Sequence, residues 1–568
     1  MGSQIHPFLA TSPLNRLFSP LRRLPRFRAD VLVVGSGAAG LASALESAER
    51  GLHVMVLCKG GVEDTNTRYA QGGIAAAVGL DDAPDLHAAD TQQVGYGLCD
   101  QSVVSSLTEA APSTMDWLIE MGTRFDRNPD GTLSLGKEAG HRVARILHSA
   151  GTATGLELQR SLHARARSHP KIDFIPRTAA VDLLKDAEGK VAGLMAFLYR
   201  NGENRPEEVL FEASAVVLAT GGGGQIFRET TNPHLATGDG LAMALRAGAV
   251  LRDLEFVQFH PTTLYLAGAA RFLISEVTRG AGAILRDRNG YAFMKEVHAD
   301  AELAPRDIVS RAISRRMVET GDTHVYLDLS PITEPQKKFP SLAKIAQEFG
   351  MNLAEDSIPV RPAVHYFVGG IQSDLQGRTS VDGLWATGEC ASTGFHGANR
   401  MGSNSLLEGL VHGRSVGQAV AQSFSASHRR FLFPMAATTT LTSSAELNLP
   451  DMTYSLKSLM WRQVGMERDA AGLEDALGRL RDWESYLARL GAFTPAAVEV
   501  VNMVQVGAAL TQSALFREES RGAHFRTDFP DTVSSWQRHS LLDYSSETLH
   551  LRSSPLLNST PTLPTVDC

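Results

Sequence analysis

The feature that most constrains the fold is a glycine-rich turn, GSGAAG, at residues 35–40. An apolar run at residues 31–34 precedes the turn, and an alanine-rich stretch follows it as far as Arg50. A second apolar run covers residues 53–57. This order predicts a β-α-β unit, whose glycines bring backbone N–H groups close to a pyrophosphate at the positive end of the helix. The segment therefore predicts a dinucleotide-binding domain.

This domain departs from that of a simple nicotinamide dehydrogenase. Cys58 and Lys59 stand at the end of the second strand, where the NAD fingerprint has an acid. Two further strand-and-glycine segments follow much later, at residues 215–224 and 383–389. All can contact one cofactor if the domain is interrupted and then resumes. We therefore expect residues 254–366 to form an inserted domain.

The last third of the chain is expected to be helical. A Ser/Thr-rich linker is expected up to Pro450. Apolar residues then recur at helical spacing within residues 452–464 and 473–487. A third helix is expected from Thr494 to Phe516, because threonine is a good N-cap and the proline that follows suits the first helical position. We expect these three helices to form a bundle that packs or docks without chemistry of its own.

Both ends of the chain differ from the rest. Residues 1–28 contain five arginines and no acid, which fits either an organellar transit peptide or a basic, partly ordered N-terminal extension. Residues 531–568 are rich in Ser, Thr and Pro and show no periodicity, so we expect a disordered tail.

Composition argues against several classes of partner. The net charge is -8, and we find no extended basic face for nucleic acid. No apolar run approaches the roughly 18 residues of a membrane-spanning helix. The four cysteines lack C-x-x-C spacing, which argues against a metal site or a disulfide framework and favours a reducing cytoplasm; they are Cys58, Cys99, Cys390 and Cys568.

Four basic residues, His260, Arg306, His365 and Arg400, lie in or beside glycine-containing segments. Basic clusters suit dianionic substrates, since an arginine can hold a carboxylate through two charge-assisted hydrogen bonds and histidines can donate to a second. Each could instead satisfy a buried carbonyl or an ion pair.

Five motifs in order carry a resemblance to a known family: YAQGGI, QFHPTT, APRD, HYFVGG and HGANRM, starting at residues 69, 258, 304, 365 and 396. The chain resembles the L-aspartate oxidase family, related to the flavoprotein subunits of succinate dehydrogenase and fumarate reductase. The resemblance implies an α/β fold: a two-segment, Rossmann-like FAD-binding domain with an inserted α+β capping domain and a C-terminal three-helix bundle. The expected divisions are 1–28, an extension; 29–253 and 367–436, FAD-binding; 254–366, capping; 437–530, helical; and 531–568, tail.

The resemblance also implies roles for individual residues. Those for FAD are Gly35, Ser36, Gly37, Ala38, Ala39, Gly40, Lys59, Asn66, Thr67, Tyr69, Ala70, Gln71, Gly72, Gly73, Asp239, Glu389, Ser405 and Leu406. Those for substrate carboxylates are His260, His365, Arg400, Ser403, Ser275 and Leu273. Asn66 stands where membrane-linked relatives have the histidine that attaches FAD, so the FAD is expected to be noncovalent.

Two residues carry sharper expectations. The resemblance makes Arg306 the proton donor or acceptor, although a guanidinium is a poor base and electrostatic stabilisation is a competing role. Glu138 lies where the family recognises the substrate amino group; the alternative is an ion pair with Lys137 or Arg142 on a solvated turn.

The implied reaction oxidises L-aspartate to iminoaspartate, with FAD reoxidised by oxygen, giving H2O2, or by fumarate. It would be the first step of NAD biosynthesis through quinolinate. A soluble fumarate reductase or succinate-oxidising flavoprotein remains an alternative, as does a scaffold that passes iminoaspartate to quinolinate synthase.

Overall fold

The computed structural model describes residues 24–200, 205–266, 271–424, 447–490, 494–545 and 548–556. At its centre is a parallel sheet in the order β18-β11-β2-β3-β7. The strands, in that order, are Leu384–Ala386, Ala215–Leu218, Val31–Val34, Val54–Leu57 and Ile172–Ile175. The glycine turn joins β2 to helix α1, Ala38–Glu49. The predicted β-α-β unit is confirmed, and β11 and β18 bring the two later glycine segments to the same sheet.

Alternate residues of β2 enter different cores, as the pleat of a strand requires. Val31 and Val33 pack in a core with α1 and with helix α12, Asn404–Ser423. Leu32 and Val34 pack in a core with a second sheet, of order β1-β10-β9-β8. That sheet comprises Arg26–Arg28, Glu207–Glu212, Val191–Leu198 and Thr178–Lys185. The end of the expected N-terminal extension is therefore a strand of the fold, while residues 1–23 lie outside the described residues.

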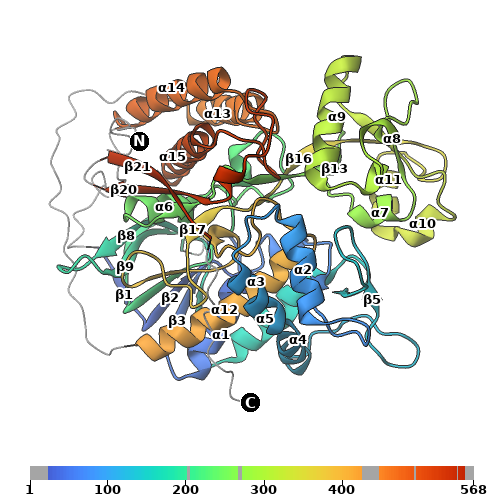
Figure 1. Ribbon diagram of the computed structural model, residues 1–568. Helices are drawn as coiled ribbons and strands as arrows, with labels where there is room; N and C mark the ends of the chain where they lie inside the picture. Colours follow the sequence, from blue (N-terminus) through green and yellow to red (C-terminus); the bar gives the residue numbers. More distant parts are fainter. Residues whose placement is uncertain are drawn as a thin grey trace.

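Helix α12 lies along α1 at very close range (Figure 1). A Cβ placed on Gly413 would lie 2.5 Å from the carbonyl oxygen of Ala39, and one on Gly417 would lie 2.5 Å from that of Ser43. Larger residues at these two positions would separate the helices. This packing brings the N-termini of both helices to one side of the sheet.

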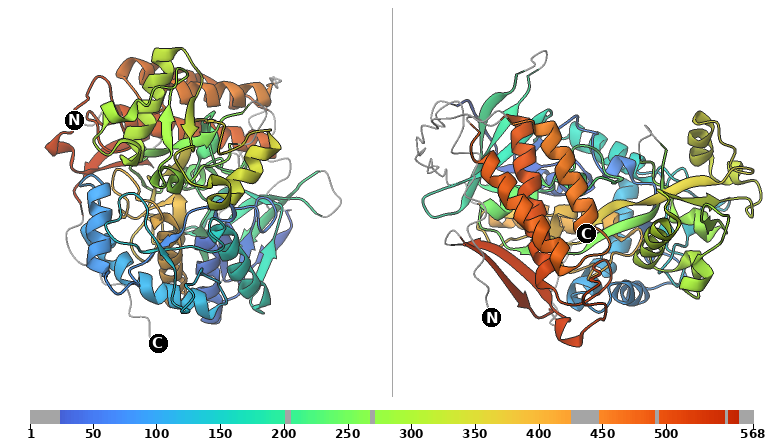
Figure 2. Two further views of the ribbon diagram at one scale, coloured as in Figure 1. Left: turned by 90° about the vertical axis from the view of Figure 1, so that its right-hand side faces the viewer. Right: turned by 90° about the horizontal axis from the view of Figure 1, so that it is seen from above.

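The inserted segment builds its own sheet and its own core. The sheet order is β13-β16-β15-β14, with strands Val257–Leu264, Ile358–Phe367, Val325–Asp328 and Ile284–Arg286. Helix α9, Arg306–Thr320, contributes Val309 and Ile313 to a core with Leu327 and other residues of this segment. Strands β13 and β16 run as a long ribbon from the centre of the molecule to this part (Figures 1 and 2).

The three predicted C-terminal helices are present and pack together (Figure 2). They are α13, Leu449–Gln463; α14, Ala470–Leu487; and α15, Pro495–Phe516. Thr494 caps α15, because its side chain accepts a hydrogen bond from the amide of Ala497. The predicted start of this helix is confirmed. The boundary expected at residues 436 and 437, and most of the expected linker, lie outside the described residues.

The expectation of a disordered tail from residue 531 is wrong for most of the part that the structure describes. Strands β20, His539–Ser545, and β21, Thr548–Ser554, form an antiparallel hairpin. The hairpin joins a sheet of order β19-β17-β12-β20-β21, whose first three strands are Ala391–Ser392, Gly370–Gln372 and Leu251–Arg252. Leu541, Leu542 and Leu549 are buried, and these few apolar residues are enough to anchor it. The polar composition of the tail concealed them, because its leucines stand among many serines and threonines.

The remaining elements are short or connect the parts above. They are η3 Thr67–Tyr69, β4 Ile74–Ala75, α2 Pro84–Val94, α3 Gln101–Glu109, α4 Ala111–Glu120, β5 Leu135–Gly136, β6 Ile146–Leu147, α5 Thr154–Ser168, η4 Gly224–Ile226, α6 Asp239–Arg246, β12 Leu251–Arg252, α7 Glu276–Gly280, α8 Met294–Val297, η5 Ala301–Leu303, α10 Pro335–Lys338, α11 Pro340–Glu348, β17 Gly370–Gln372, η6 Gly388–Cys390, β19 Ala391–Ser392 and η7 Ser534–Trp536.

Within the described ranges, no helix has the length and apolar character needed to cross a membrane. The same residues contain no group of His, Cys, Asp and Glu side chains placed to hold a metal ion. Cys58, Cys99 and Cys390 are free thiols and are buried. Cys568 lies outside the described residues.

Candidate active site

A large open cavity, with about 1930 Å³ of empty space, lies where the N-termini of α1 and α12 meet the inserted segment. Nearly all the residues expected to bind cofactor or substrate line it: Gly35, Ser36, Gly37, Ala38, Ala39, Lys59, Asn66, Thr67, Tyr69, Ala70, Gln71, Gly72, Gly73, Glu138, Asp239, His260, Leu273, Ser275, Arg306, His365, Glu389, Arg400, Ser403, Ser405 and Leu406. Residues that are distant in the sequence, from Gly35 to Leu406, are thus brought to one space.

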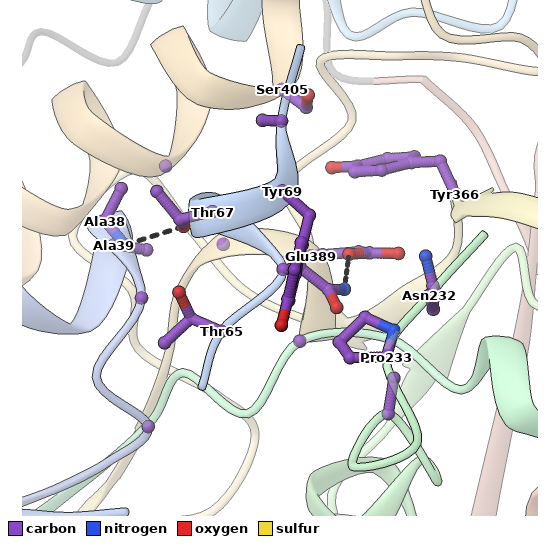
Figure 3. Close-up of a pocket in the computed structure, with 18 of the residues that line it drawn as sticks. Ala38, Ala39, Thr65, Thr67, Tyr69, Asn232, Pro233, Tyr366, Glu389 and Ser405 are labelled. Carbon is purple, nitrogen blue, oxygen red and sulfur yellow. Dashed lines mark hydrogen bonds between the residues drawn. The ribbon is translucent and has the colours of Figure 1, made fainter. Parts of the chain in front are cut away.

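The glycine turn forms one end of the cavity. Gly35 has φ of +116°, and a Cβ there would lie 2.2 Å from the carbonyl oxygen of Ala219. Gly40 does not line the cavity; a Cβ on it would lie 2.1 Å from the carbonyl oxygen of Gly35, so only glycine allows this close approach of α1 to the turn. The amide of Ala38 donates to the hydroxyl of Thr67 beside the turn (Figure 3). Bare backbone at a helix N-terminus fits a pyrophosphate.

Lys59 and Asp239 form an ion pair at this end of the cavity. Nζ of Lys59 lies 2.7 Å from Oδ2 of Asp239 and 2.6 Å from Oε1 of Glu499. Asn502 donates to the other oxygen of Asp239 at 2.8 Å. Glu499 and Asn502 belong to α15. The C-terminal helices therefore contact two residues expected to bind FAD, Lys59 and Asp239, in addition to packing against the rest of the fold.

Glu389 closes the middle of the cavity together with Asn66. Oε2 of Glu389 accepts from the side-chain amide of Asn66 at 3.2 Å (Figure 3). Oε1 accepts from the backbone amide of Phe367 at 3.1 Å. Burial raises the pKa of the Glu389 carboxyl. The carboxylate therefore joins two segments that are distant in the sequence.

The basic residues gather at the other end of the cavity. Arg306 and Arg400 both donate to the side-chain oxygen of Gln258, at 3.3 and 3.2 Å. The rings of His260 and His365 lie edge to face, with centroids 5.5 Å apart. Nε of Arg400 is buried and has no hydrogen-bond partner in the described part of the chain. The cluster therefore retains capacity to bind an anion.

Burial governs the charge of this cluster. It lowers the pKa of His260 well below its usual value, and the positive Arg306 lowers it further. Burial and then Arg400 do the same to the pKa of His365. Burial also lowers the pKa of Arg400, to about 10. Near neutral pH the histidines are therefore uncharged donors or acceptors, while Arg400 keeps its charge.

Sequence reasoning missed a carboxylate beside Arg306. Oε2 of Glu276 accepts from Nη2 and Nε of Arg306, at 2.8 and 3.0 Å. Oε1 accepts from the buried Arg279 at 3.1 Å. Burial alone would raise the pKa of Glu276, but Arg306 and Arg279 outweigh it and lower the pKa to about 2. The sequence does place an acid, Glu276, three residues before Arg279, a spacing that favours an ion pair. No local pattern, however, indicates that Glu276 also binds Arg306.

Glu138 faces the cavity and is buried, with 8% of its surface exposed. Oε2 accepts from the hydroxyl of Ser403 at 2.8 Å, and Oε1 lies 3.8 Å from Nε2 of His148. Burial raises its pKa, but contacts with His148, Arg306 and Ser403 outweigh this and lower it. The alternative of a solvated ion pair is wrong, because Arg142 pairs with Asp90 instead.

Comparison with known proteins identifies the family. Residues 30–406 match the family model described as FAD binding domain, and residues 453–564 match Fumarate reductase flavoprotein C-term. An L-aspartate oxidase of Streptomyces coelicolor is 42% identical over 528 residues, with 90% of each chain covered. One of Nostoc sp. is 41% identical over 545 residues, covering 90% of this chain and 93% of the relative. This chain belongs to the L-aspartate oxidase family.

Members of the L-aspartate oxidase family are FAD-dependent oxidoreductases, and FAD is the cofactor of this chain. A solved structure of E. coli quinol fumarate reductase FrdA superposes with a TM-score of 0.85 at 30% identity, covering 95% of this chain and 99% of the other. The fold is accordingly mixed α/β, with an FAD-binding domain and a C-terminal helical domain. A side chain at Gly35 would collide with the backbone of Ala219, so the turn exposes bare backbone, which fits the pyrophosphate of FAD.

Proposed function

We propose that this chain oxidises L-aspartate to iminoaspartate, the first step of NAD biosynthesis through quinolinate. The observation that carries the proposal is a buried carboxylate, Glu138, set among basic residues. A Cβ on Gly402 would lie 2.7 Å from Oε2 of Glu138 and 3.3 Å from Nη2 of Arg306, so the two side chains converge there. Glu276 is already held by Arg306 and Arg279, whereas Glu138 contacts Ser403 and His148. A carboxylate not held by an arginine, beside several donors, matches a substrate with two carboxylates and one ammonium group.

The basic residues would bind the two carboxylates. Arg400 can form charge-assisted hydrogen bonds through its guanidinium, and His260 and His365 can donate as neutral imidazoles. Thr231 contacts Nδ1 of His365 at 3.0 Å, which orients this ring. Ser403, Leu273 and Ser275 complete the lining. Ser275 is also the N-cap of α7, so its hydroxyl is already engaged with the amide of Val277 at 3.4 Å.

Bound FAD supplies the redox chemistry, accepting the two electrons and the hydrogen that leave the substrate carbon. The residues that would hold it are those of the glycine turn, Lys59, the segment 66–73, Asp239, Glu389 and the start of α12. The dipole of α12 at Ser405 and Leu406 would stabilise negative charge. The chain's own contribution is to position the substrate and to exclude water.

Arg306 is the residue best placed to act on a substrate held in this cluster. Its guanidinium is fixed by Glu276 and Gln258 while it faces the cavity. A guanidinium is a poor base by itself. The contact with Glu276 supports a role in proton movement, and the positive charge supports stabilisation of developing negative charge.

Residues 254–366 would act as a capping domain between the segments 29–253 and 367–436, with residues 437–530 as the helical bundle. The FAD would be noncovalent, and oxygen or fumarate would reoxidise it. The compartment would be the cytoplasm, and quinolinate synthase is a candidate recipient of the product.

One experiment separates the leading candidates. FAD-loaded protein is mixed anaerobically with L-aspartate, D-aspartate or succinate, and bleaching of the flavin absorbance is followed. Bleaching by L-aspartate alone supports the proposal. Bleaching by succinate without aspartate would identify a succinate-oxidising flavoprotein instead. Turnover of the isolated chain would make any scaffold role secondary.

A further inference from the structure

We propose that Tyr96 is a positioning residue for the reaction: its hydroxyl holds Asp307, and Asp307 keeps the neighbouring Arg306 in place. The inference rests on the proposed function, because it takes Arg306 to be the residue that acts on the substrate. Neither Tyr96 nor Asp307 lines the cavity. Both would therefore act only through Arg306.

Tyr96 lies in an unusual turn between α2 and α3. Its φ is +53°, and that of the following Gly97 is +72°. A tyrosine rarely adopts this left-handed conformation, and it persists only where the surrounding structure holds it. The turn therefore needs an external support.

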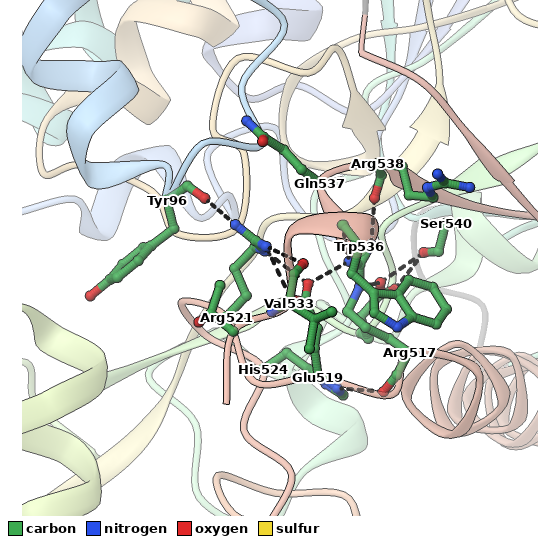
Figure 4. Close-up of polar contacts among 12 residues, drawn as sticks. Tyr96, Arg517, Glu519, Arg521, His524, Val533, Trp536, Gln537, Arg538 and Ser540 are labelled. Carbon is green, nitrogen blue, oxygen red and sulfur yellow. Dashed lines mark hydrogen bonds and ion pairs between the residues drawn. The ribbon is translucent and has the colours of Figure 1, made fainter. Parts of the chain in front are cut away.

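The C-terminal segment provides that support (Figure 4). Nη1 of Arg521 donates to the carbonyl oxygen of Tyr96 at 2.7 Å, and the side-chain amide of Gln537 donates to that of Gly97 at 2.8 Å. Both oxygens of Glu519 accept from Arg521, at 2.8 and 3.0 Å. The backbone of the turn is thus clamped from the other end of the chain.

The residues that hold this turn are themselves bonded to residues that lie just before the inserted segment. Arg517 donates to Glu519 at 2.9 Å and to Glu255 at 2.6 Å. All three side chains are fully buried. Ser540 also donates to Glu255, at 2.7 and 2.8 Å. This network ties the turn to the residues immediately before β13 (Figure 4).

Asp307 is the point at which α9 docks onto this turn. It is buried, and burial raises the pKa of its carboxyl. Oδ1 accepts from the Tyr96 hydroxyl at 3.4 Å and from the side-chain amide of Asn399 at 3.5 Å, while Oδ2 accepts from Arg311 at 3.0 Å. Since a buried carboxylate needs such donors, losing one shifts or loosens the first turn of α9.

Asn399, which donates to Asp307, also connects this turn to Arg306 and Arg400. The side-chain oxygen of Asn399 accepts from Gln258 at 2.8 Å, and Gln258 in turn accepts from Arg306 and Arg400. Arg306 is the first residue of α9, directly before Asp307. A displacement of about 1 Å at a reacting group can cost about 100-fold in rate, so the docking of this turn bears on catalysis.

A purely structural account is the alternative. Asp307 is an acid in the first turn of a helix, where it interacts favourably with the helix dipole, and it pairs with Arg311 four residues later. Under that account the Tyr96 hydroxyl is incidental.

The test compares Tyr96→Phe in the FAD-loaded, full-length protein with Tyr291→Phe as a matched control. Tyr291 also donates to a carboxylate, Glu296, but it lies exposed in the inserted segment and outside the cavity. We expect Tyr96→Phe to lower kcat about tenfold for both aspartate oxidation and fumarate reduction, with KM and FAD affinity within about twofold of wild type. The control should retain wild-type kcat.

A second comparison uses an Arg306→Lys background. There Tyr96→Phe should lower kcat by less than about threefold, because the guanidinium geometry is already lost. An unchanged kcat in Tyr96→Phe, an equal tenfold loss in both backgrounds, or a loss of FAD affinity with kcat unchanged would overturn the inference alone. Full turnover by Arg306→Leu would instead overturn the role of Arg306 in the proposed function, and the inference with it.

Discussion

The hydroxyl of Ser403 donates a 2.8 Å hydrogen bond to Glu138, although the two residues lie 265 positions apart in the sequence. Ser403 adopts a left-handed conformation, with φ of +62°, directly before α12. The bond leaves Oε1 of Glu138 beside His148 and Gly72. This arrangement supports the proposal that Glu138 determines which diacid the site accepts.

Glu138→Gln should lower kcat/KM for L-aspartate by about 10- to 150-fold, because a charge-assisted hydrogen bond is worth about 1.5 to 3 kcal/mol. Fumarate carries no ammonium group, so fumarate reduction should change much less. Steady-state kinetics with both substrates check this. Glu63→Gln, at an exposed glutamate paired with Arg68, is the control. Equal loss of both activities would show a structural role, and unchanged kinetics would remove Glu138 from substrate recognition.

Arg306→Leu should fold and bind FAD but lose turnover, because an interaction made mainly in the transition state affects kcat more than binding. Arg306→Lys should recover part of the activity if positive charge is what matters. Arg288→Leu, at an exposed arginine of the same segment, should retain activity. A kcat for Arg306→Leu within about threefold of wild type, less than 1 kcal/mol of barrier, would exclude a catalytic role.

Acid or heat denaturation should release all the yellow colour into the supernatant. The reason is that Asn66, an amide without a nucleophilic ring nitrogen, stands where covalent attachment would need a histidine, and its side chain is bonded to Glu389. Absorbance of supernatant and pellet near the flavin bands measures the distribution. Flavin that stays on the precipitated chain would show a covalent bond.

The stability of the protein should fall as the pH drops below about 6.5, the usual value for histidine. His365 has a folded pKa well below this, so the unfolded state binds its proton first and gains relative stability as the pH falls. Above about pH 6.5 neither state binds this proton, so His365 adds no pH dependence to the free energy of unfolding. His365→Asn should reduce the slope of the free energy of unfolding against pH by about 1.4 kcal/mol per pH unit at most.

Urea unfolding of the apoprotein between pH 5 and pH 8 measures this effect. His298→Asn, at a partly exposed histidine with 33% of its side chain accessible, is the control. A wild-type slope in His365→Asn would show that His365 titrates alike in both states.

Local patterns were sufficient for those parts of the fold that short-range physics determines. The glycine turn predicted the β-α-β unit, and Thr494 with Pro495 predicted the start of α15, because turn geometry and helix capping depend on neighbouring residues. The family motifs also pointed to the residues that line the cavity. The hairpin at residues 539–554 escaped this reasoning, since its burial depends on β12.

The sequence by itself therefore determined the dinucleotide-binding unit, the helical C-terminal region and the set of polar residues near the site. Only the tertiary structure decided their partners. It pairs Glu276 with Arg306, buries Glu138 beside Ser403, and brings Arg521 into hydrogen-bond contact with the turn at Tyr96. These pairs join elements that meet only when sheets and helices pack, and their energies depend on burial, which no local pattern specifies.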